Sequence, residues 1–257
     1  KEALLQPGIE WDSFERMLPY ARKIKLIGGE PTVAMDMFKL LDIAVESGHA
    51  EHIELSFYTN ITNMQNKWLD QLAKFEKVIV NCSLEGMGKM NDYMRPPSQW
   101  DSVWKHFDKL VKFSDTQEGK RIKVRVTTVN QLSNALHLTT FWKFMHDYQM
   151  TSNRGIGMST NQLVEPAYYS MAYAPEWLKE EQREQILEFL ESIKDSPHYE
   201  QYEEPLMEAL NFSLDTEHRY DANVMRQYVK VTENYDSHRG HDIHSVSPEF
   251  TRIKEAL

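Results

Sequence analysis

The sequence contains a single cysteine, Cys82, among its 257 residues. One thiol cannot form an internal disulfide, and it cannot by itself supply a cluster or zinc site that needs several thiolates. Long apolar runs are also missing: none approaches the roughly 20 residues that a membrane span requires, and no signal peptide opens the chain. We therefore expect a cytoplasmic protein without a membrane partner.

Positive charge is scarce as well. The 29 Lys and Arg residues face 39 Asp and Glu residues, which gives a net charge of −10. This balance argues against a protein that binds nucleic acid over its whole surface, although a local basic groove would survive it. Hydrophobic residues make up 41% of the chain and aromatic residues 11%, so a sizeable core can form and wholesale disorder is excluded.

Short apolar runs alternate with longer amphipathic segments over the first 150 residues. The runs are rich in β-branched and aromatic residues and predict strands at 24–27, 53–58, 78–82 and 124–129, with a weaker fifth at 155–159. Between them, apolar residues repeat at spacings of three and four. This pattern predicts helices over 34–45, 103–111 and 138–148. Strand–helix–strand repetition of this length requires parallel pairing, so we predict an α/β fold.

The ends of the first predicted helix can be read from single residues. Thr32 can cap its start and Gly48 can end it. After Pro166 the pattern changes, because no strand signal is convincing and helices are predicted over 176–194 and around 206–212 and 224–229. We expect residues 166–257 to form a helical extension on a core of residues 1–165. The alternation alone does not decide whether the sheet closes into a barrel.

Small and polar residues follow three successive predicted strands. They are Gly28-Gly29-Glu30-Pro31, Thr59-Asn60 and Ser83-Leu84-Glu85-Gly86. Each has an ordinary structural interpretation as a turn, a cap or, for Glu85, a partner of Arg95. Together they lie where α/β folds bind ligands, at the carboxyl ends of strands, and they suit a ligand with amino and ribose groups.

The ordered series of these motifs resembles the core of the radical S-adenosylmethionine (SAM) enzymes, and most closely those with a twitch or SPASM-type extension. The segment from Asn91 to Arg95 is similar to that family's H/N-D-x-x-R element, and Asn134 and His137 match its N-x-x-H-L pattern. The segment 246–250, with Pro248-Glu249, resembles the closing segment of phage and marine members.

This resemblance implies a fold, a cofactor and a set of binding residues. The implied fold is an incomplete (β/α) barrel, and the implied cofactor is SAM, cleaved at a 4Fe–4S cluster to a 5′-deoxyadenosyl radical. The amino end of SAM would be held by Gly28, Gly29, Glu30 and Pro31, and its carboxylate or ribose by Asn60, Ser83 and Glu85. The substrate, a small molecule or a peptide, stays open. We expect the site residues to converge on one pocket.

Two departures from the family pattern bear on activity. Glu85 replaces the usual Asp, which ribose binding tolerates. The C-x-x-x-C-x-x-C loop that holds the cluster is missing, and Cys82, expected to be a buried core residue, cannot replace three thiolates. We therefore expect a truncated barrel that lacks at least its first strand, that holds a cluster only if the missing segment is present, and that is inactive as given.

Two other functions remain open from the sequence. The first is a cluster-free α/β barrel that binds a nucleoside-like ligand or another protein. The second, an acid–base enzyme that uses Glu30 and Glu85, is weaker because no His or Lys partner is evident at the strand ends.

Three further features have competing interpretations. His238, His241 and His244 suggest a metal site, but their spacing around Gly240 favours a solvated turn. Arg125 could bind a carboxylate if it points inward, and is a partly buried packing residue if it points outward. The stiff loop at 94–98 forms either a lid or a simple connection.

Overall fold

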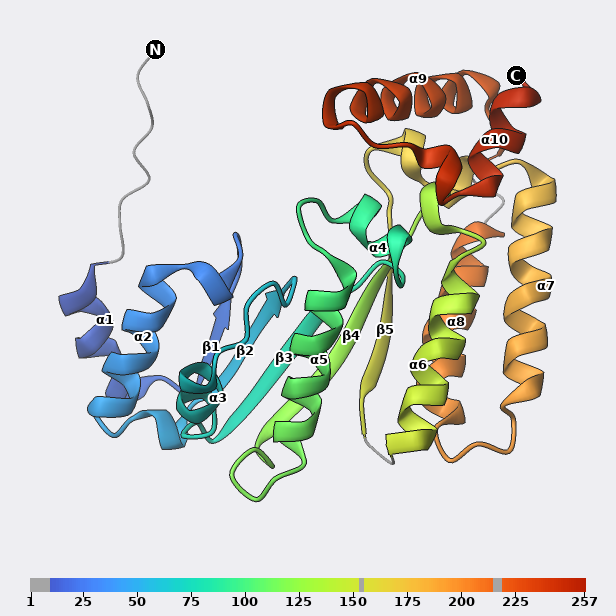
Figure 1. The fold of residues 1–257 in the computed structure, drawn as a ribbon. Helices are drawn as coiled ribbons and strands as arrows, with labels where there is room; N and C mark the ends of the chain where they lie inside the picture. Colours follow the sequence, from blue (N-terminus) through green and yellow to red (C-terminus); the bar gives the residue numbers. More distant parts are fainter. Residues whose placement is uncertain (1–9, 153–154, 215–218) are drawn as a thin grey trace, which may run out of the picture. The chain divides into compact units, whose positions relative to one another are not determined.

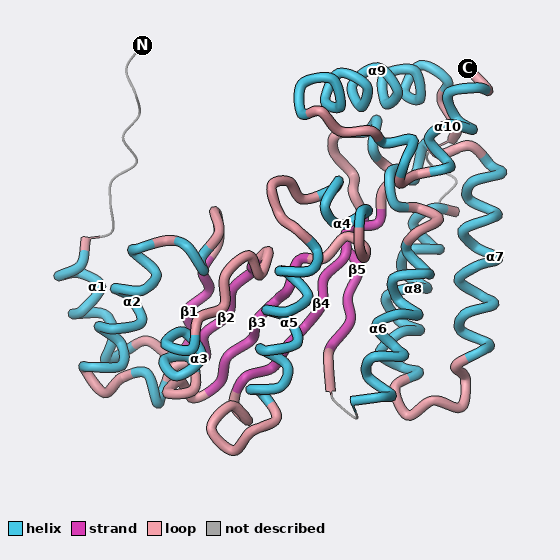
Figure 2. The backbone as a smooth tube through the Cα atoms, in the orientation of Figure 1, coloured by secondary structure: helices cyan, strands magenta, loops and turns pink. Residues whose placement is uncertain are grey.

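The computed structural model describes residues 10–152, 155–214 and 219–257 (Figure 1). Five strands form one sheet in the order β1-β2-β3-β4-β5, and each strand is followed by at least one helix before the next (Figure 2). The registers of β1 with β2 and of β2 with β3 are parallel. The α/β fold predicted from the alternating pattern is therefore confirmed. The chain divides into two compact units, residues 1–82 with 103–125, and residues 83–102 with 126–257.

The first unit contains the amino-terminal strands and the helices between them. Its helices and strands are α1 (Trp11–Met17), β1 (Lys23–Leu26), α2 (Met35–Glu46), β2 (Glu54–Thr59), α3 (Asn66–Leu72) and most of β3 (Lys77–Ser83) and α5 (Trp100–Ser114), with short 3-10 turns at Leu18–Tyr20, Pro31–Val33 and Ala50–His52. Its core is aromatic, since Phe57, Trp68, Phe75 and Phe107 are completely buried. This packing fixes the ends of β1 and β2, from which two of the predicted motifs extend.

The second unit contains the rest of the sheet and the carboxyl-terminal helices. Its elements are α4 (Lys89–Met94), most of β4 (Ile122–Asn130), α6 (Leu138–Ser152), β5 (Gly157–Gln162), α7 (Glu176–Ser192), α8 (Tyr199–Ser213), α9 (Ala222–Arg239) and α10 (Pro248–Glu255), with 3-10 turns at Leu132–Asn134, Ala167–Tyr169, Met171–Tyr173 and Ile243–Ser245. Helix α8 packs on β5 and on α7, and α7 also packs on α6 (Figure 1). A separate buried cluster, which includes Tyr228 and Phe250, joins α9 and α10 to the turn after β4.

Most of the predicted elements are confirmed, with shifts of a few residues at their ends. All five strands lie where the apolar runs placed them, and the residues described after Pro166 form helices and turns with no strand. The predicted cap of α2 is wrong, because the helix begins after Ala34 and Thr32 lies in the preceding 3-10 turn. The Thr32 hydroxyl donates instead to Glu30. The division into domains at residue 165 stays a prediction.

Within the described ranges, no helix has the length and apolar character needed to cross a membrane.

Candidate functional site

The carboxylate of Glu30, at the end of β1, is the centre of a hydrogen-bonded group in the first unit. Its Oε1 accepts from Thr32 N–H at 3.2 Å and from the hydroxyls of Thr32 and Thr59 at 2.5 Å each. Its Oε2 accepts from the Asn60 N–H at 2.6 Å. We call these four residues the Glu30 cluster. They bring the Gly-Gly-Glu-Pro motif into direct contact with the Thr-Asn motif of β2, as the sequence analysis expected of neighbouring strand ends.

Two glycines lead the chain into this cluster. Gly28 has a φ of +99° and Gly29 a φ of +52°, conformations that residues with a Cβ rarely adopt. A Cβ built on either residue would meet nothing within 4 Å, so the backbone conformation and not crowding requires glycine here. Both glycines are exposed and Pro31 is buried. The backbone of the two glycines is therefore exposed to solvent next to Glu30 in the sequence.

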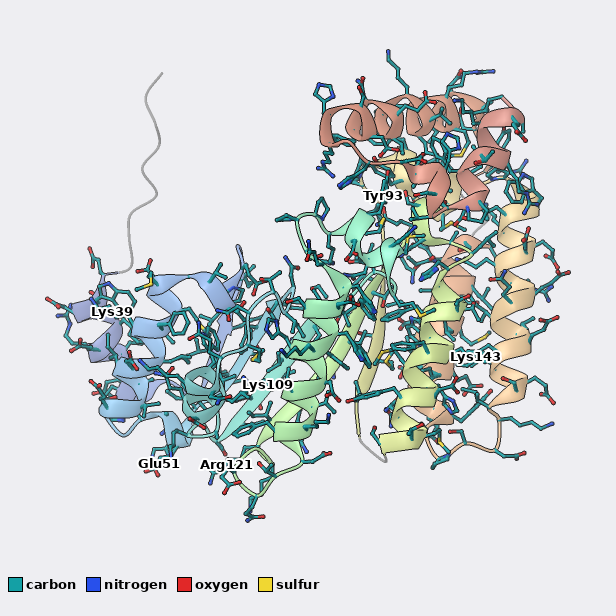
Figure 3. The ribbon with its side chains drawn as sticks, in the orientation of Figure 1. Lys39, Glu51, Tyr93, Lys109, Arg121 and Lys143 are labelled. Atoms are coloured by element: carbon teal, nitrogen blue, oxygen red, sulfur yellow. The ribbon has the colours of Figure 1, made fainter. Side chains whose placement is uncertain are left out.

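The end of β2 is held in place by its own contacts and by helix α5. Ile61, with a φ of +55°, is the one described residue other than glycine with a positive φ, and its side chain is completely buried. For a β-branched residue this is a strained conformation. His106 Nδ1 lies 3.1 Å from the Ile61 carbonyl, and Lys109 donates to the Met64 carbonyl at 2.7 Å (Figure 3). These bonds fix the loop that positions Asn60.

Glu85, after β3, is the centre of a second group, in the second unit. Its carboxylate accepts from Arg95 through Nε at 3.2 Å and through Nη2, and from Val129 N–H at 2.6 Å. Its backbone N–H donates to Asn91 Oδ1 at 3.3 Å. Glu85 is only 4% exposed. The pairing with Arg95, one of the two alternatives for Glu85, is the one that the structure contains.

Asn134 and His137, the two residues of the N-x-x-H-L pattern, hold the turn that contains Glu85 through hydrogen bonds. Asn134 donates to the carbonyls of Glu85, at 3.0 Å, and of Val129, at 2.9 Å. His137 Nε2 accepts from the Met87 N–H at 3.2 Å, and burial lowers the pKa of His137, which keeps it neutral and able to accept. We call Glu85, Asn91, Arg95, Asn134 and His137 the Glu85 cluster. The residues of the two family-like motifs therefore fix the turn at 85–87 through hydrogen bonds.

Opposing effects act on the ionisation of Glu85. Burial raises the pKa of Glu85, and the charge of Arg95 together with the Val129 N–H opposes this rise. A buried carboxylate is stable when it is paired and hydrogen-bonded, as this one is. With Arg95 and Val129 bound, the Glu85 carboxylate has a structural role. Its predicted contact with ribose stays a prediction.

The remaining predicted site residues occupy different environments. Ser83 is half-buried, and its hydroxyl has no hydrogen-bond partner among the described residues. Arg125 is exposed on β4, so it is not a partly buried packing residue, and whether it faces the site stays a prediction. Since Glu30 and Asn60 belong to the first unit while Ser83 and Glu85 belong to the second, their convergence on one pocket stays a prediction.

The chain's own residues do not fit a 4Fe–4S cluster. Cys82 is completely buried, and burial, followed by the charge of Glu30, raises the pKa of its thiol, which disfavours the thiolate that binds iron. Three thiolates are needed and the sequence has one cysteine. In the parts of the chain that are described, no three His, Cys, Asp or Glu side chains are grouped for any metal. His238 and His244 are exposed; His244 lies in a 3-10 turn, whereas His238 belongs to helix α9, so the predicted turn does not include His238.

The comparisons with known proteins give partial matches. No family model matches the chain. The mycofactocin maturase MftC of Mycolicibacterium smegmatis is 30% identical over 122 residues, which is 47% of this chain and 30% of that protein. This sequence similarity supports the radical SAM superfamily. The chain thus spans about a third of the length of the curated relative that it matches.

Two solved structures match part of the chain at low identity. Streptococcus suis SuiB, bound to S-adenosylmethionine, matches over 71% of this chain and 39% of its own, with 18% identity and a TM-score of 0.46. The protein anSMEcpe, with bound AdoMet, matches over 71% of this chain and 50% of its own, with 16% identity and a TM-score of 0.47.

Sequence reasoning missed the contacts of two residues that organise the second unit, although it named Glu249 within the segment 246–250. Asp236 accepts from the Tyr93 hydroxyl at 2.9 Å, and Glu249, completely buried, accepts from the Leu136 N–H at 3.1 Å. Both contacts join residues more than 100 positions apart in the chain. The one available signal was an acidic residue placed among apolar ones, as Glu249 is beside Phe250.

Proposed function

We propose that this chain is the SAM-binding part of a radical SAM enzyme. The observation that carries the proposal is the Glu30 cluster, a carboxylate fixed at a strand end beside two exposed glycines. When bound to such an enzyme, SAM is the source of a 5′-deoxyadenosyl radical. The sequence similarity to a mycofactocin maturase supports this proposal at the level of the superfamily.

Glu30 would bind the ammonium group of SAM. A carboxylate has about four acceptor positions, and Oε2 of Glu30 accepts a single hydrogen bond within the described chain, so it can accept another. Thr32, Thr59 and the Asn60 N–H already fix the carboxylate in position. Preorganisation of this kind reduces the entropy lost on binding. Gly28, Gly29 and Pro31 would shape the turn that the amino-acid end contacts.

The other predicted residues would act at the carboxylate and ribose of SAM. Asn60 lies next to Thr59 in the Glu30 cluster, and the Ser83 hydroxyl is half-exposed with no partner among the described residues. Glu85 would position the turn that follows Ser83, because its own carboxylate is occupied by Arg95 and Val129. We place it in the site as a positioning residue.

The cluster thiolates must come from outside these 257 residues, because the sequence contains one cysteine and that cysteine is buried. We therefore propose that the chain alone generates no radical, and that it is a fragment of a twitch or SPASM-type protein whose helical extension is residues 166–257. The cluster-free binding protein remains the second candidate, favoured by the same lack of thiolates.

Calorimetric titration with SAM tests the binding proposal. We expect the natural chain to bind SAM and Glu30→Ala to weaken binding by about tenfold or more, the size expected for a lost hydrogen bond to a charged group. Glu51→Ala is the matched control, since Glu51 is an exposed glutamate paired only with His52 at the surface (Figure 3). Unchanged affinity in Glu30→Ala, or no binding by the natural chain, would overturn the proposal.

Anaerobic reconstitution with iron and sulfide tests the missing cluster. We expect the chain to bind far less iron than the four atoms per chain of a 4Fe–4S cluster. The iron content of Cys82→Ala should equal that of the natural chain. About four irons per chain would show that the chain holds a cluster without further cysteines, which contradicts the proposal.

A further inference from the structure

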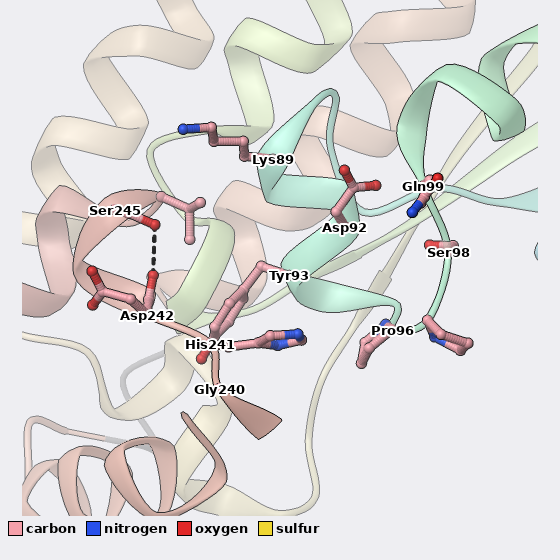
Figure 4. Close-up of a pocket in the computed structure, with 12 residues that line it drawn as sticks. Lys89, Asp92, Tyr93, Pro96, Ser98, Gln99, Gly240, His241, Asp242 and Ser245 are labelled. Carbon is pink, nitrogen blue, oxygen red and sulfur yellow. Dashed lines mark hydrogen bonds between the residues drawn. The ribbon is translucent and has the colours of Figure 1, made fainter. Parts of the chain in front are cut away.

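A cavity of about 570 Å³ lies in the second unit, between residues 89–99 and residues 240–246 (Figure 4). Its size falls within the range of about 300–1,000 Å³ that is usual for ligand sites. None of the residues in the Glu30 cluster lines it. One wall consists of α4 and the Pro96-Pro97 loop, and the other of the chain between α9 and α10. We call it the Tyr93 cavity.

Asp236 of α9 ties the two walls together. Its carboxylate accepts from the Tyr93 hydroxyl on one wall at 2.9 Å and from the Ile243 N–H on the other at 2.7 Å. Its backbone carbonyl accepts from the His241 N–H at 3.1 Å. Burial and the hydrogen bond to Asp236 raise the pKa of Tyr93, so the phenol remains a donor. The ring of Tyr93 is therefore fixed before any ligand arrives.

The Pro96-Pro97 loop is anchored in the same way at its base. Ser98 donates to the Arg95 carbonyl through its N–H at 2.9 Å and through its hydroxyl at 2.5 Å. Arg95 in turn holds Glu85. The sequence left open whether the loop at 94–98 is a lid or a simple connection. In the structure it forms a wall of the cavity and is held by hydrogen bonds at its base.

The groups that face the cavity define the ligand it can accept. Flat surfaces come from the rings of Tyr93 and His241, whose centroids lie 5.8 Å apart, and from the two prolines. Gln99 is exposed and His241 is half-buried, and neither the Gln99 amide nor the His241 imidazole is hydrogen-bonded to another described residue. A primary amide both donates and accepts, as a peptide group does. The lining contains one Lys and two Asp residues, which does not favour a phosphate or another strong anion.

We propose that the Tyr93 cavity binds an aromatic side chain presented by a polypeptide. The ring packs against Tyr93, His241 and the prolines, and the Gln99 amide pairs with the adjoining peptide group. This binding does not require SAM, so it can be tested whether or not the proposed function holds.

The test is an NMR titration of the nitrogen-15-labelled chain of 257 residues with N-acetyl-L-tyrosinamide. We expect shifts to be concentrated in residues 89–99 and 240–246, and N-acetyl-L-leucinamide to bind more weakly by about two- to tenfold, the factor that aromatic pairing supplies. His241→Ala should weaken tyrosinamide binding by a similar factor. The matched control is His238→Ala, which removes an exposed histidine of the same segment that does not line the cavity.

A second comparison isolates the amide contact. Gln99→Ala should lower the affinity for N-acetyl-L-tyrosinamide by about two- to tenfold. It should leave the affinity for 4-methylphenol unchanged, because that compound has no peptide group. Shifts located elsewhere, equal binding of the leucine and tyrosine probes, or equal effects of His241→Ala and His238→Ala would each overturn the proposal. Failure of SAM to bind would leave these outcomes unaffected.

Discussion

At the scale of single residues, the Glu85 carboxylate has a structural partner in Arg95, while its predicted contact with ribose stays a prediction. The sequence left two alternatives for this carboxylate, a ribose contact and a pairing with Arg95. The structure contains the pairing, with Glu85 4% exposed and the Arg95 side chain 23% exposed. An ion pair buried to this degree stabilises a fold only while both partners are present.

Arg95→Leu should therefore destabilise the chain by about 3 kcal/mol at pH 7, because it leaves a buried carboxylate without its cation. Burial then raises the pKa of Glu85 above its value in the unfolded chain, so the loss of stability grows as pH rises. The loss shrinks as pH falls below about 4.3, the usual pKa of an unfolded glutamate, because Glu85 then becomes protonated in both states. Urea denaturation at several pH values measures this. Arg183→Leu, which breaks the exposed pair with Glu180, should cost less than about 1 kcal/mol. Equal costs for both variants would contradict the assignment.

Gly86 is required by the close approach of His137. A Cβ at Gly86 would lie 2.7 Å from Met90 Cγ and 2.8 Å from His137 Cδ2. Gly86→Ala should lower the free energy of unfolding by about 2 kcal/mol, which is the usual effect of overpacking. Gly155→Ala is the control, since its Cβ meets nothing within 4 Å, and it should be neutral or slightly stabilising. Thermal unfolding of both variants checks this, and an unchanged melting temperature in Gly86→Ala would refute it.

At the scale of elements, the strands and most helices follow from periodicity because each buries a regular stripe or face. Strand β4, for example, alternates buried and exposed residues from Ile122 to Val126. The error at Thr32 has a local cause. A threonine before a helix is a normal cap, but here a 3-10 turn intervenes and Glu30 takes the hydroxyl, which a single sequence does not reveal.

The docking of α10 depends on Glu249, which the sequence analysis named only as part of the segment 246–250. Its Oε1 accepts from Leu136 N–H, while its Oε2 is buried without a hydrogen-bond partner in the described structure. Burial raises the pKa of Glu249 and exceeds the opposing effect of hydrogen bonds, among them that from the Leu136 N–H; the nearby charge of Glu181 adds a smaller rise. The folded state therefore disfavours the ionised form of Glu249 more than the unfolded chain does.

Glu249→Gln should therefore change stability in a pH-dependent way. A raised pKa in the folded state means that the natural chain loses stability as pH rises through that pKa, whereas glutamine does not ionise. We expect the two proteins to be nearly equal at pH 4, and the variant to be more stable by about 1–3 kcal/mol at pH 8. Denaturation curves at both pH values measure the difference. At each pH, the free energy of unfolding of the natural chain is subtracted from that of Glu249→Gln. A difference that is smaller at pH 8 than at pH 4 would contradict this account.

At the scale of the whole molecule, the sequence predicted which residues follow each strand but not all of their partners. Contacts such as that of Thr59 with Glu30 follow from the adjacency of parallel strand ends. Those of Asp236 with Tyr93 and of Glu249 with Leu136 depend on how the carboxyl-terminal helices pack, which no local pattern specifies. The Tyr93 cavity was missed for the same reason, although its loop was noted.

The central claim is that Glu30 recognises the amino group of SAM. The most direct measurement compares SAM with 5′-methylthioadenosine, which lacks the amino-acid end, on the natural chain and on Glu30→Ala. We predict that the variant binds SAM at least about tenfold more weakly and binds 5′-methylthioadenosine with unchanged affinity. Equal weakening for both ligands would mean that Glu30 only maintains the fold, and no weakening for either would place it outside the site.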